Sequence, residues 1–330
     1  MHYDMPPALP AALPALPPAA PPALPPALPA VAPPALPAVP APSRRDGRPP
    51  VTGDLRLVGL GPADTEALVA LLEVAYGRAW RRGDLTLFQQ VQPDGWYAMA
   101  AGTSLVAAAG AISYGPLCWI GSVATHPGWQ RRGLARRLTE HLVSWAWRNG
   151  AHTVALDASD QGEPVYRRLG FTGDAATVEY LVPRHGGRLA PGTRLARPDD
   201  LPAILAFDEA AFGCSRAALL GGLLADPANR CLLAEERGTL RGYLVDRADV
   251  LGPGAALTPG LAVALVSSAR TLPSPADAAR LMVPVESDAH HALAAAGLPC
   301  QRALAHLRVG RPDLGGARHR LFAQTSFGAG

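Results

Sequence analysis

A turn at residues Gln130–Ala135, with the sequence QRRGLA, has the residue types of an anion-binding site. Apolar residues at helical spacing follow it, so the turn opens a helix that ends near Gly150. The first amides of a helix have no intrahelical partner, its dipole is positive there, and a glycine lets an anion approach the backbone closely. We expect the turn to bind a pyrophosphate, with Arg131, Arg132 and Arg136 adding positive charge, although arginines along one helix are also typical of a solvated face.

Tyr166 is the second candidate for chemistry. It lies in a short predicted helix that follows the strand Thr153–Ala158 and closes at Gly170. A phenol beside a developing anion can act as a general acid. Taken alone, a tyrosine at such a position is more often a half-buried packing residue, so Tyr166 predicts chemistry only together with the turn.

The elements around these residues follow from periodicity and turn residues. Leu117–Thr125 is a buried strand that leads into the turn, and Phe171 begins the strand after Tyr166. Upstream, the sequence predicts a strand at 55–60, helices at 62–76 and 84–91, and a hairpin formed by 96–101 and 105–114.

Three features occur in this order: a strand, a Q-x-x-G-x-A turn that begins a long helix, and about 30 residues later a strand with Y-x-x-x-G-F. Together they resemble the GNAT superfamily of N-acetyltransferases. The resemblance covers roughly residues 51–182. It implies an α/β (α+β) fold with a mixed, mostly antiparallel sheet flanked by helices. It also implies acetyl-CoA as co-substrate and no metal.

The resemblance assigns roles to individual residues. The amides of the turn would bind pyrophosphate, with Ala135 standing where many members have Gly. The amides or carbonyls of Val123 and Thr125 would hold the pantetheine arm and polarise the thioester carbonyl, Tyr166 would protonate the thiolate, and Ser159 replaces the usual Asn. The implied catalytic residue is Tyr166, and the implied cofactor-binding residues are Val123, Thr125, Gln130, Arg131, Arg132, Gly133, Leu134, Ala135, Arg136 and Ser159.

The group that accepts the amine's proton is not evident, because residues 117–125 contain no acid. Removal of the proton through water is one solution. The acids to test are Glu73, Asp84, Asp157 and Glu179. Trp80, Trp96 and Tyr114 could form the wall of an acceptor pocket or belong to the core.

After a linker at Pro183–Gly192, the order of elements repeats. Strands are predicted at 194–196, 231–235, 240–246, near 250, at 281–285, 304–309 and 321–326, and helices at 199–212, 215–225, 259–270 and before Gly297. This half resembles the C-terminal domain of tandem GNAT proteins. No Q-x-x-G-x-G turn follows Val250, however, and Leu293 stands where Tyr166 would be expected. We expect residues 51–186 to form the catalytic domain and 187–330 a degenerate GNAT-like domain that shapes the acceptor site or packs against the first.

Residues 1–50 have a different composition, with 18 of the chain's 35 prolines. Proline cannot continue a helix, so the uncharged stretch from Met5 to Pro42 is neither a membrane span nor a signal peptide. We expect a disordered Pro/Ala-rich tail. A solvated spacer, a partner-recruiting segment, and an extension upstream of a start near Val51 all remain open.

Charge and cysteine usage restrict the class of protein. From Val51 onward 27 arginines face 25 acids with no basic block, which argues against nucleic acid as a ligand. The four cysteines, Cys118, Cys214, Cys231 and Cys300, are far apart and indicate reduced thiols in a cytoplasmic protein. The resemblance to GNAT enzymes implies an acyltransferase that transfers acetyl groups to a primary amine, on a small molecule rather than on a protein. The alternative is a non-catalytic acyl-CoA-binding or sensor module. The acceptor and the oligomeric state stay open.

Overall fold

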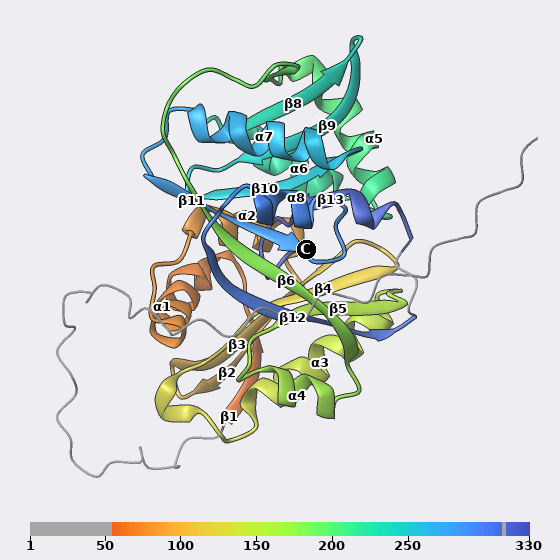
Figure 1. Ribbon diagram of the computed structural model, residues 1–330. Coiled ribbons are helices and arrows are strands. Elements are labelled where there is room, and N and C mark those ends of the chain that lie inside the picture. Colours follow the sequence, from red (N-terminus) through yellow and green to blue (C-terminus); the bar gives the residue numbers. More distant parts are fainter. Residues whose placement is uncertain (1–54, 312–314) are drawn as a thin grey trace, which may run out of the picture. The chain divides into compact units, whose positions relative to one another are not determined.

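The computed structural model (Figure 1) describes residues 55–311 and 315–330, so the predicted tail at 1–50 lies outside the described residues. Within these described residues, no helix is both long enough and apolar enough to cross a membrane. The four cysteines are all free thiols.

The first half contains the elements that the sequence predicts, with ends that differ by a few residues. Its strands are β1 (Leu55–Gly59), β2 (Trp96–Ala101), β3 (Ser104–Ser113), β4 (Leu117–Thr125), β5 (Thr153–Ala158) and β6 (Thr172–Pro183). Its helices are α1 (Thr65–Tyr76), α2 (Arg82–Val91), α3 (Leu134–Arg148) and α4 (Glu163–Arg168). Short 3₁₀ turns at Pro62–Asp64 and Pro127–Trp129 precede α1 and α3.

The second half repeats this order. Its strands are β7 (Thr193–Leu195), β8 (Arg230–Glu236), β9 (Thr239–Asp246), β10 (Val250–Ala256), β11 (Ala278–Pro284), β12 (Cys300–Gly310) and β13 (Leu321–Ala323). Its helices are α5 (Leu201–Phe212), α6 (Ala217–Ala225), α7 (Pro259–Thr271) and α8 (His290–Ala295). The predicted boundary between residues 186 and 187 falls between β6 and β7 and remains a prediction.

The strands form one continuous sheet in the described part of the chain. Its order is β1-β2-β3-β4-β5-β12-β6-β11-β10-β9-β8-β7, and β13 pairs with β10 beside this path. The pairs β4/β5 and β10/β11 are parallel, and the other pairs are antiparallel. The sequence of parallel and antiparallel pairs is therefore the same whether it is followed from β1 or from β7.

At the centre of the sheet the two halves exchange a strand. β12, from the second half, lies between β5 and β6, with Leu307 opposite Leu156. β6, from the first half, pairs with β11, with Met282 opposite Glu179. The predicted strand at 304–309 is confirmed, but the sequence does not predict that its neighbours belong to the first half.

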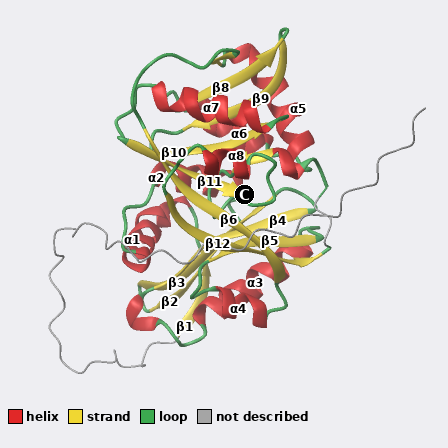
Figure 2. Ribbon diagram, viewed as in Figure 1, coloured by secondary structure: helices red, strands yellow, loops and turns green. Residues whose placement is uncertain are grey.

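Helices flank both halves of the sheet (Figure 2), as the resemblance implied. Leu138, Leu142 and Trp145 of α3 pack on the first half, whereas Leu265 and Leu293 of α7 and α8 pack on the second. Helices α1, α2, α5 and α6 contribute to a third core that both halves share. Trp96 and Tyr114 lie in this shared core, with 3% and 6% of their surface exposed, so they are core residues.

The segment after β13, residues 324–330, crosses back over β4. The indole nitrogen of Trp119 donates to the carbonyl of Phe327 at 3.2 Å, and the hydroxyl of Tyr114 donates to the carbonyl of Ala329 at 2.7 Å. A β-carbon at Gly121 would overlap the backbone of Gly328. The strand that leads into the candidate site therefore carries a glycine where the terminal segment passes.

Candidate functional site

β4 and β5 diverge beside the predicted turn. Their parallel pairing runs from Leu117 opposite Thr153 to Trp119 opposite Ala155 and then stops. Further along β4 the register with β3 shifts, and Ser122 has a positive φ of 52°. This is a β-bulge, which bends the strand away from its neighbour. The last residues of β4 are thus left without a partner on the β5 side.

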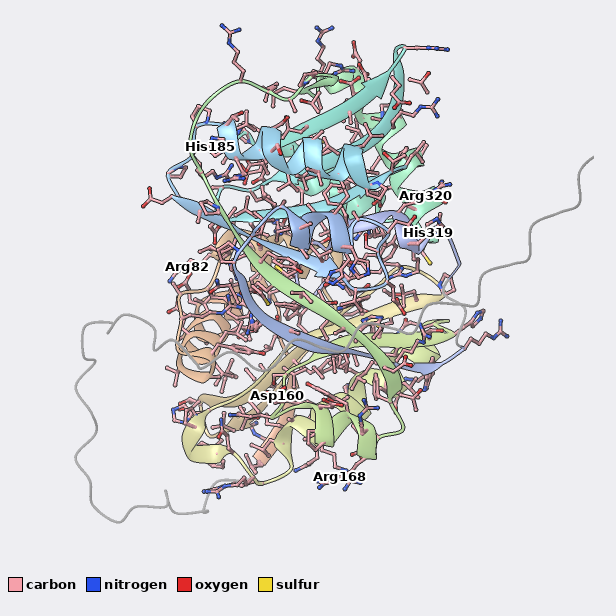
Figure 3. All side chains as sticks on the ribbon, in the orientation of Figure 1. Arg82, Asp160, Arg168, His185, His319 and Arg320 are labelled. Carbon is pink, nitrogen blue, oxygen red and sulfur yellow. The ribbon has the colours of Figure 1, made fainter. Side chains whose placement is uncertain are left out.

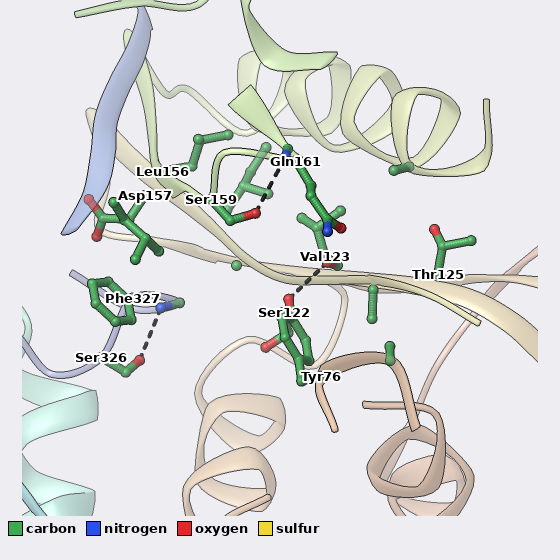
Figure 4. Close-up of a pocket in the computed structure, with 18 of the residues that line it drawn as sticks. Tyr76, Ser122, Val123, Thr125, Leu156, Asp157, Ser159, Gln161, Ser326 and Phe327 are labelled. Carbon is green, nitrogen blue, oxygen red and sulfur yellow. Dashed lines mark hydrogen bonds between the residues drawn. The ribbon is translucent and has the colours of Figure 1, made fainter. Parts of the chain in front are cut away.

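A cavity of about 1240 Å³ lies at this divergence and has walls from both halves of the chain. Ten of the eleven predicted site residues line it: Val123, Thr125, Gln130, Arg131, Gly133, Leu134, Ala135, Arg136, Ser159 and Tyr166. Figure 4 labels Val123, Thr125 and Ser159 among them. Arg132 does not line the cavity; its guanidinium lies 4.6 Å from the centre of the Trp129 ring. Asp160 and Arg168 add charged groups from the loop before α4 and from α4 itself (Figure 3).

The turn before α3 presents free backbone amides to the cavity. Gly133 is the N-cap of α3 with φ 75°, and Arg131 has φ 60°. The helical ladder begins with the amide of Arg137, which donates to the carbonyl of Gly133 at 3.0 Å. No acceptor within the described residues takes the amides of 131–136. Such amides, at the positive end of a 15-residue helix, fit a pyrophosphate.

Tyr166 is 7% exposed, and its ring packs edge-on against Phe171 with 6.0 Å between centres. Tyr166 lines the cavity, and its hydroxyl has no hydrogen-bond partner among residues 55–311 and 315–330. Burial, and then the nearby Tyr76, raises the pKa of Tyr166 above the usual value. The phenol therefore keeps its proton at neutral pH and is available as a donor.

Two neighbours of Tyr166 have local hydrogen bonds that the sequence does not predict. The hydroxyl oxygen of Ser159 accepts the amide of Gly162 at 3.3 Å, in the loop that leads into α4. Tyr76, at the end of α1, donates its hydroxyl to the carbonyl of Val123 at 2.8 Å (Figure 4). The carbonyl of Val123 is therefore already engaged. No motif marks Tyr76, because a tyrosine at a helix end is ordinary.

Two of the four candidate bases lie near the α1–α2 connection. Glu73 accepts the amide of Trp80 at 3.1 Å and is not part of the cavity wall. Asp84 lines the cavity, but its carboxylate lies between Arg81, at 3.0 Å, and Arg247, at 2.7 Å. Trp80 lines the cavity, as expected for an acceptor wall.

The other two acids are buried beside the exchanged strand. One oxygen of Asp157 accepts from Thr177 at 3.0 Å and meets the ring nitrogen of His306 at 3.1 Å, and the whole side chain is inaccessible. Glu179 pairs with Arg302 at 3.1 Å and is 6% exposed. Each of the four acids therefore has at least one hydrogen-bond or ion-pair partner, and Asp84 and Asp157 are the two that line the cavity.

The corresponding place in the second half is filled by the chain itself. β10 and β11 pair at Val250 and Leu251 and then diverge as β4 and β5 do. β13 pairs with β10 in the gap, and the amide of Gln324 donates to the carbonyl of Met282 on β11 at 2.9 Å. This gap is therefore closed by β13.

The helix that corresponds to α3 also begins differently. The hydroxyl of Thr258 accepts the amide of Leu261 at 3.4 Å, and Pro259 has no amide hydrogen to offer. Leu293, which stands in place of Tyr166, is fully buried. Within the described part of the chain, no cluster of three or more His, Cys, Asp or Glu side chains could hold a metal ion.

Comparison with known proteins identifies the family to which both halves belong. The profile of the Acetyltransferase (GNAT) family matches residues 65–171, and that of the Acetyltransferase (GNAT) domain matches residues 204–323. The uncharacterized N-acetyltransferase YitH of Bacillus subtilis (strain 168) is 28% identical over 142 residues, which are 42% of this chain and 50% of that protein. The chain thus spans about half the length of the curated relative that it matches.

Solved structures share the fold. A candidate acetyltransferase from Pyrococcus horikoshii is 22% identical, with a TM-score of 0.74 over 84% of this chain and 96% of that one. A tandem GNAT protein from the clavulanic acid biosynthesis pathway is 15% identical, with a TM-score of 0.53 over 79% of this chain and 100% of that one. The two family matches cover well over half of the chain, which belongs to the GNAT acetyltransferase family and has two GNAT domains in tandem.

Proposed function

We propose that the chain is an acetyl-CoA-dependent N-acetyltransferase that passes the acetyl group directly to a primary amine of a small molecule. One observation carries the proposal. The free amides before α3, the unpaired end of β4 and the hydroxyl of Tyr166 all face one cavity. Family membership supports N-acetyltransferase activity, and the geometry supports the choice of coenzyme.

Each part of the site has a task in this reaction. The amides of the turn bind the pyrophosphate, and the unpaired edge of β4 holds the pantetheine arm in an extended conformation. Acetyl-CoA supplies an activated acyl group as a thioester. As the amine nitrogen forms its bond to the acyl carbon and the C–S bond breaks, Tyr166 donates its proton to the sulfur. The amine's proton leaves to water, since each of the four candidate acids is already held by a partner. Water then returns a proton to the Tyr166 phenolate.

The second half has a structural task in this proposal. Its own gap holds β13 and its helix start is capped, so one coenzyme binds per chain. It also supplies part of the cavity wall, including Met282, Leu304 and Phe327. The acceptor therefore contacts residues of both halves.

Isothermal titration with acetyl-CoA tests the coenzyme site. We expect one site per chain, and Ala135→Glu should weaken binding at least about tenfold, because it places a carboxylate beside the pyrophosphate. An acid in the first turn suits the helix dipole, so the variant should fold. The matched control is Gly260→Glu, in open space in the first turn of α7, which should bind as wild type does. Absence of heat with wild type, or equal affinity for Ala135→Glu, would overturn the coenzyme site.

A sensor that binds an acyl-CoA without turnover is the second candidate, favoured by the absence of an acid on β4 and the engagement of the four candidate acids. A thiol-release assay over a broad amine panel separates the two. Tight acetyl-CoA binding with no thiol release above the amine-free rate would favour the sensor.

A further inference from the structure

The cavity wall away from the α3 turn is rich in arginine. Arg78, Arg81, Arg247, Arg280 and Arg302 line it, and they come from the α1–α2 connection, the loop after β9, and strands β11 and β12. These residues are far apart in the sequence. The fold, and in particular the strand exchange that places β12 in the first half, brings them to one cavity.

Three carboxylates accompany these five guanidiniums. Asp84 binds Arg81 and Arg247, Asp249 binds Arg81 and Arg280, and Glu179 binds Arg302. The cluster therefore has an excess of positive charge before any ligand is bound.

Among these five arginines, Arg78 is the one without an ion-paired carboxylate within the described residues, although the charge of Glu179 also acts on it. Nowhere in 55–311 or 315–330 does a carboxylate or carbonyl accept a hydrogen bond from its guanidinium, which lies 5.1 Å from the centre of the Trp80 ring. Burial, followed by the nearby Arg280 and Arg302, lowers the pKa of Arg78 to about 10. It therefore stays charged at neutral pH, next to two like charges and with its hydrogen-bond donors unused.

Arg78 lines the same cavity as Val123 and Tyr166. The charges of Arg78 and Arg302 both act on Tyr76, and Tyr76 donates to the carbonyl of Val123. Val123 is where the thioester is proposed to lie. A small molecule can thus reach from β4 to Arg78.

We propose that the acceptor is a small primary amine that also carries an oxyanion, a carboxylate or a phosphate, which Arg78 binds with Arg280 and Arg302 beside it. This inference rests on the proposed function. A guanidinium matches both oxyanions because its fork donates two parallel hydrogen bonds. Polyamines and polycationic amino sugars are disfavoured, since they would bring further positive charge to the cluster.

Direct binding tests the inference without turnover. Protein with and without saturating acetyl-CoA is titrated calorimetrically with γ-aminobutyrate, O-phosphoethanolamine, butylamine and putrescine. We expect binding of at least one of the first two, with the preferred one identifying the oxyanion, and weaker binding of the last two. Arg78→Gln should lower the affinity for the preferred amine that carries an oxyanion by about 10- to 100-fold, the usual effect of losing a charged hydrogen bond. Arg78→Lys, which keeps the charge and loses the fork, should fall between.

The matched control is Arg188→Gln, an exposed arginine in the segment between β6 and β7, which should bind as wild type does. Thiol release with the same amines should follow the same order, with the change for Arg78→Gln in KM. Binding of no anion, equal affinity for Arg78→Gln, or a preference for putrescine or butylamine would overturn the inference. If wild-type protein binds no acetyl-CoA, or releases no thiol with any amine, the proposed function is overturned instead. Anion binding that depends on Arg78 would in that case still support the oxyanion site.

Discussion

The guanidinium of Arg247, in the second half, lies 2.7 Å from the carboxylate of Asp84, in the first. Arg247 is 1% exposed and also donates to the carbonyls of Gly252, at 2.9 Å, and Thr325. A fully buried charge is tolerated only when it is paired and hydrogen-bonded. Arg247 therefore links α2 to β10 and to the segment that follows β13.

Arg247→Met should lower the free energy of unfolding by about 3–5 kcal/mol, because it leaves Asp84 with one partner and two buried carbonyls unpaired. All six tryptophans precede Gly150, so their fluorescence reports the first half, whereas far-UV circular dichroism reports both. In urea titrations we expect the two signals to shift together. Separate transitions, or a shift as small as that of Arg188→Gln, would contradict the link.

Tyr166→Phe should reduce kcat by about 10²- to 10⁴-fold, the usual contribution of a general acid. The hydroxyl has no protein partner in the described structure, so its loss should change neither the fold nor the affinity for acetyl-CoA by more than about twofold. Burial holds the pKa of Tyr166 above its usual value, so wild-type activity should not fall through ionisation of this phenol below about pH 10. Thiol release measured across pH, with acetyl-CoA titration, checks both points; an unchanged kcat would remove Tyr166 from the mechanism.

Stability should fall as the pH rises from about 8.5 to 10. Burial raises the pKa of Cys118 and of Cys231 to about 12, whereas a thiol in the unfolded chain ionises near 8.5. In this window the folded chain holds protons that the unfolded chain has released, so the free energy of unfolding decreases with pH. The expected loss at pH 10 is about 2 kcal/mol per thiol, from 1.36 kcal/mol for each pH unit.

Urea denaturation at pH 7.5, 8.5 and 10 measures this dependence. The variant Cys118→Ala/Cys231→Ala should show a flatter profile, because its buried groups at these positions do not titrate. An equal slope in wild type and variant would exclude the two thiols as its source.

Gly121→Ala should destabilise the protein by about 1–3 kcal/mol, the usual cost of overpacking. The added carbon would overlap backbone rather than a movable side chain, so the segment around Gly328 must shift. The Trp119 indole, which donates to the carbonyl of Phe327, should then change its emission. Gly59→Ala, in open space on β1, is the matched control and should change the free energy of unfolding by less than about 0.5 kcal/mol. Identical stability and emission of both variants would contradict the close approach.

The parts of the site that the sequence predicts are those encoded within a short stretch. The turn before α3 follows from a glycine, a helical apolar stripe and a preceding strand, all within about 30 residues. Tyr166 follows from its spacing to that turn. Helix and strand periods are local properties of the chain, so these elements lie within a few residues of where we expected them.

Other features depend on which distant residues meet. Asp84 and Glu179 look like free acids in the sequence, because Arg247 and Arg302, which pair with them, are more than 100 residues away. Only Arg81, the second partner of Asp84, is close in the sequence. The apolar pattern of β12 indicates a strand but does not indicate which strands pair with it, so its neighbours cannot be predicted from periodicity. Arg78 has no motif at all, and its significance arises only from the cavity it shares with Arg280 and Arg302.

The exchange of β6 and β12 also imposes an order on synthesis. β5 leaves the ribosome early, but the strand that pairs with it ends at Gly310, about 150 residues later. Until then the nascent chain exposes the hydrogen-bonding edge of β5, and β6 has no β11 to pair with. The first half can therefore complete its sheet only after nearly the whole polypeptide has been translated, and a chain truncated after β6 would retain an open edge prone to pairing with other chains.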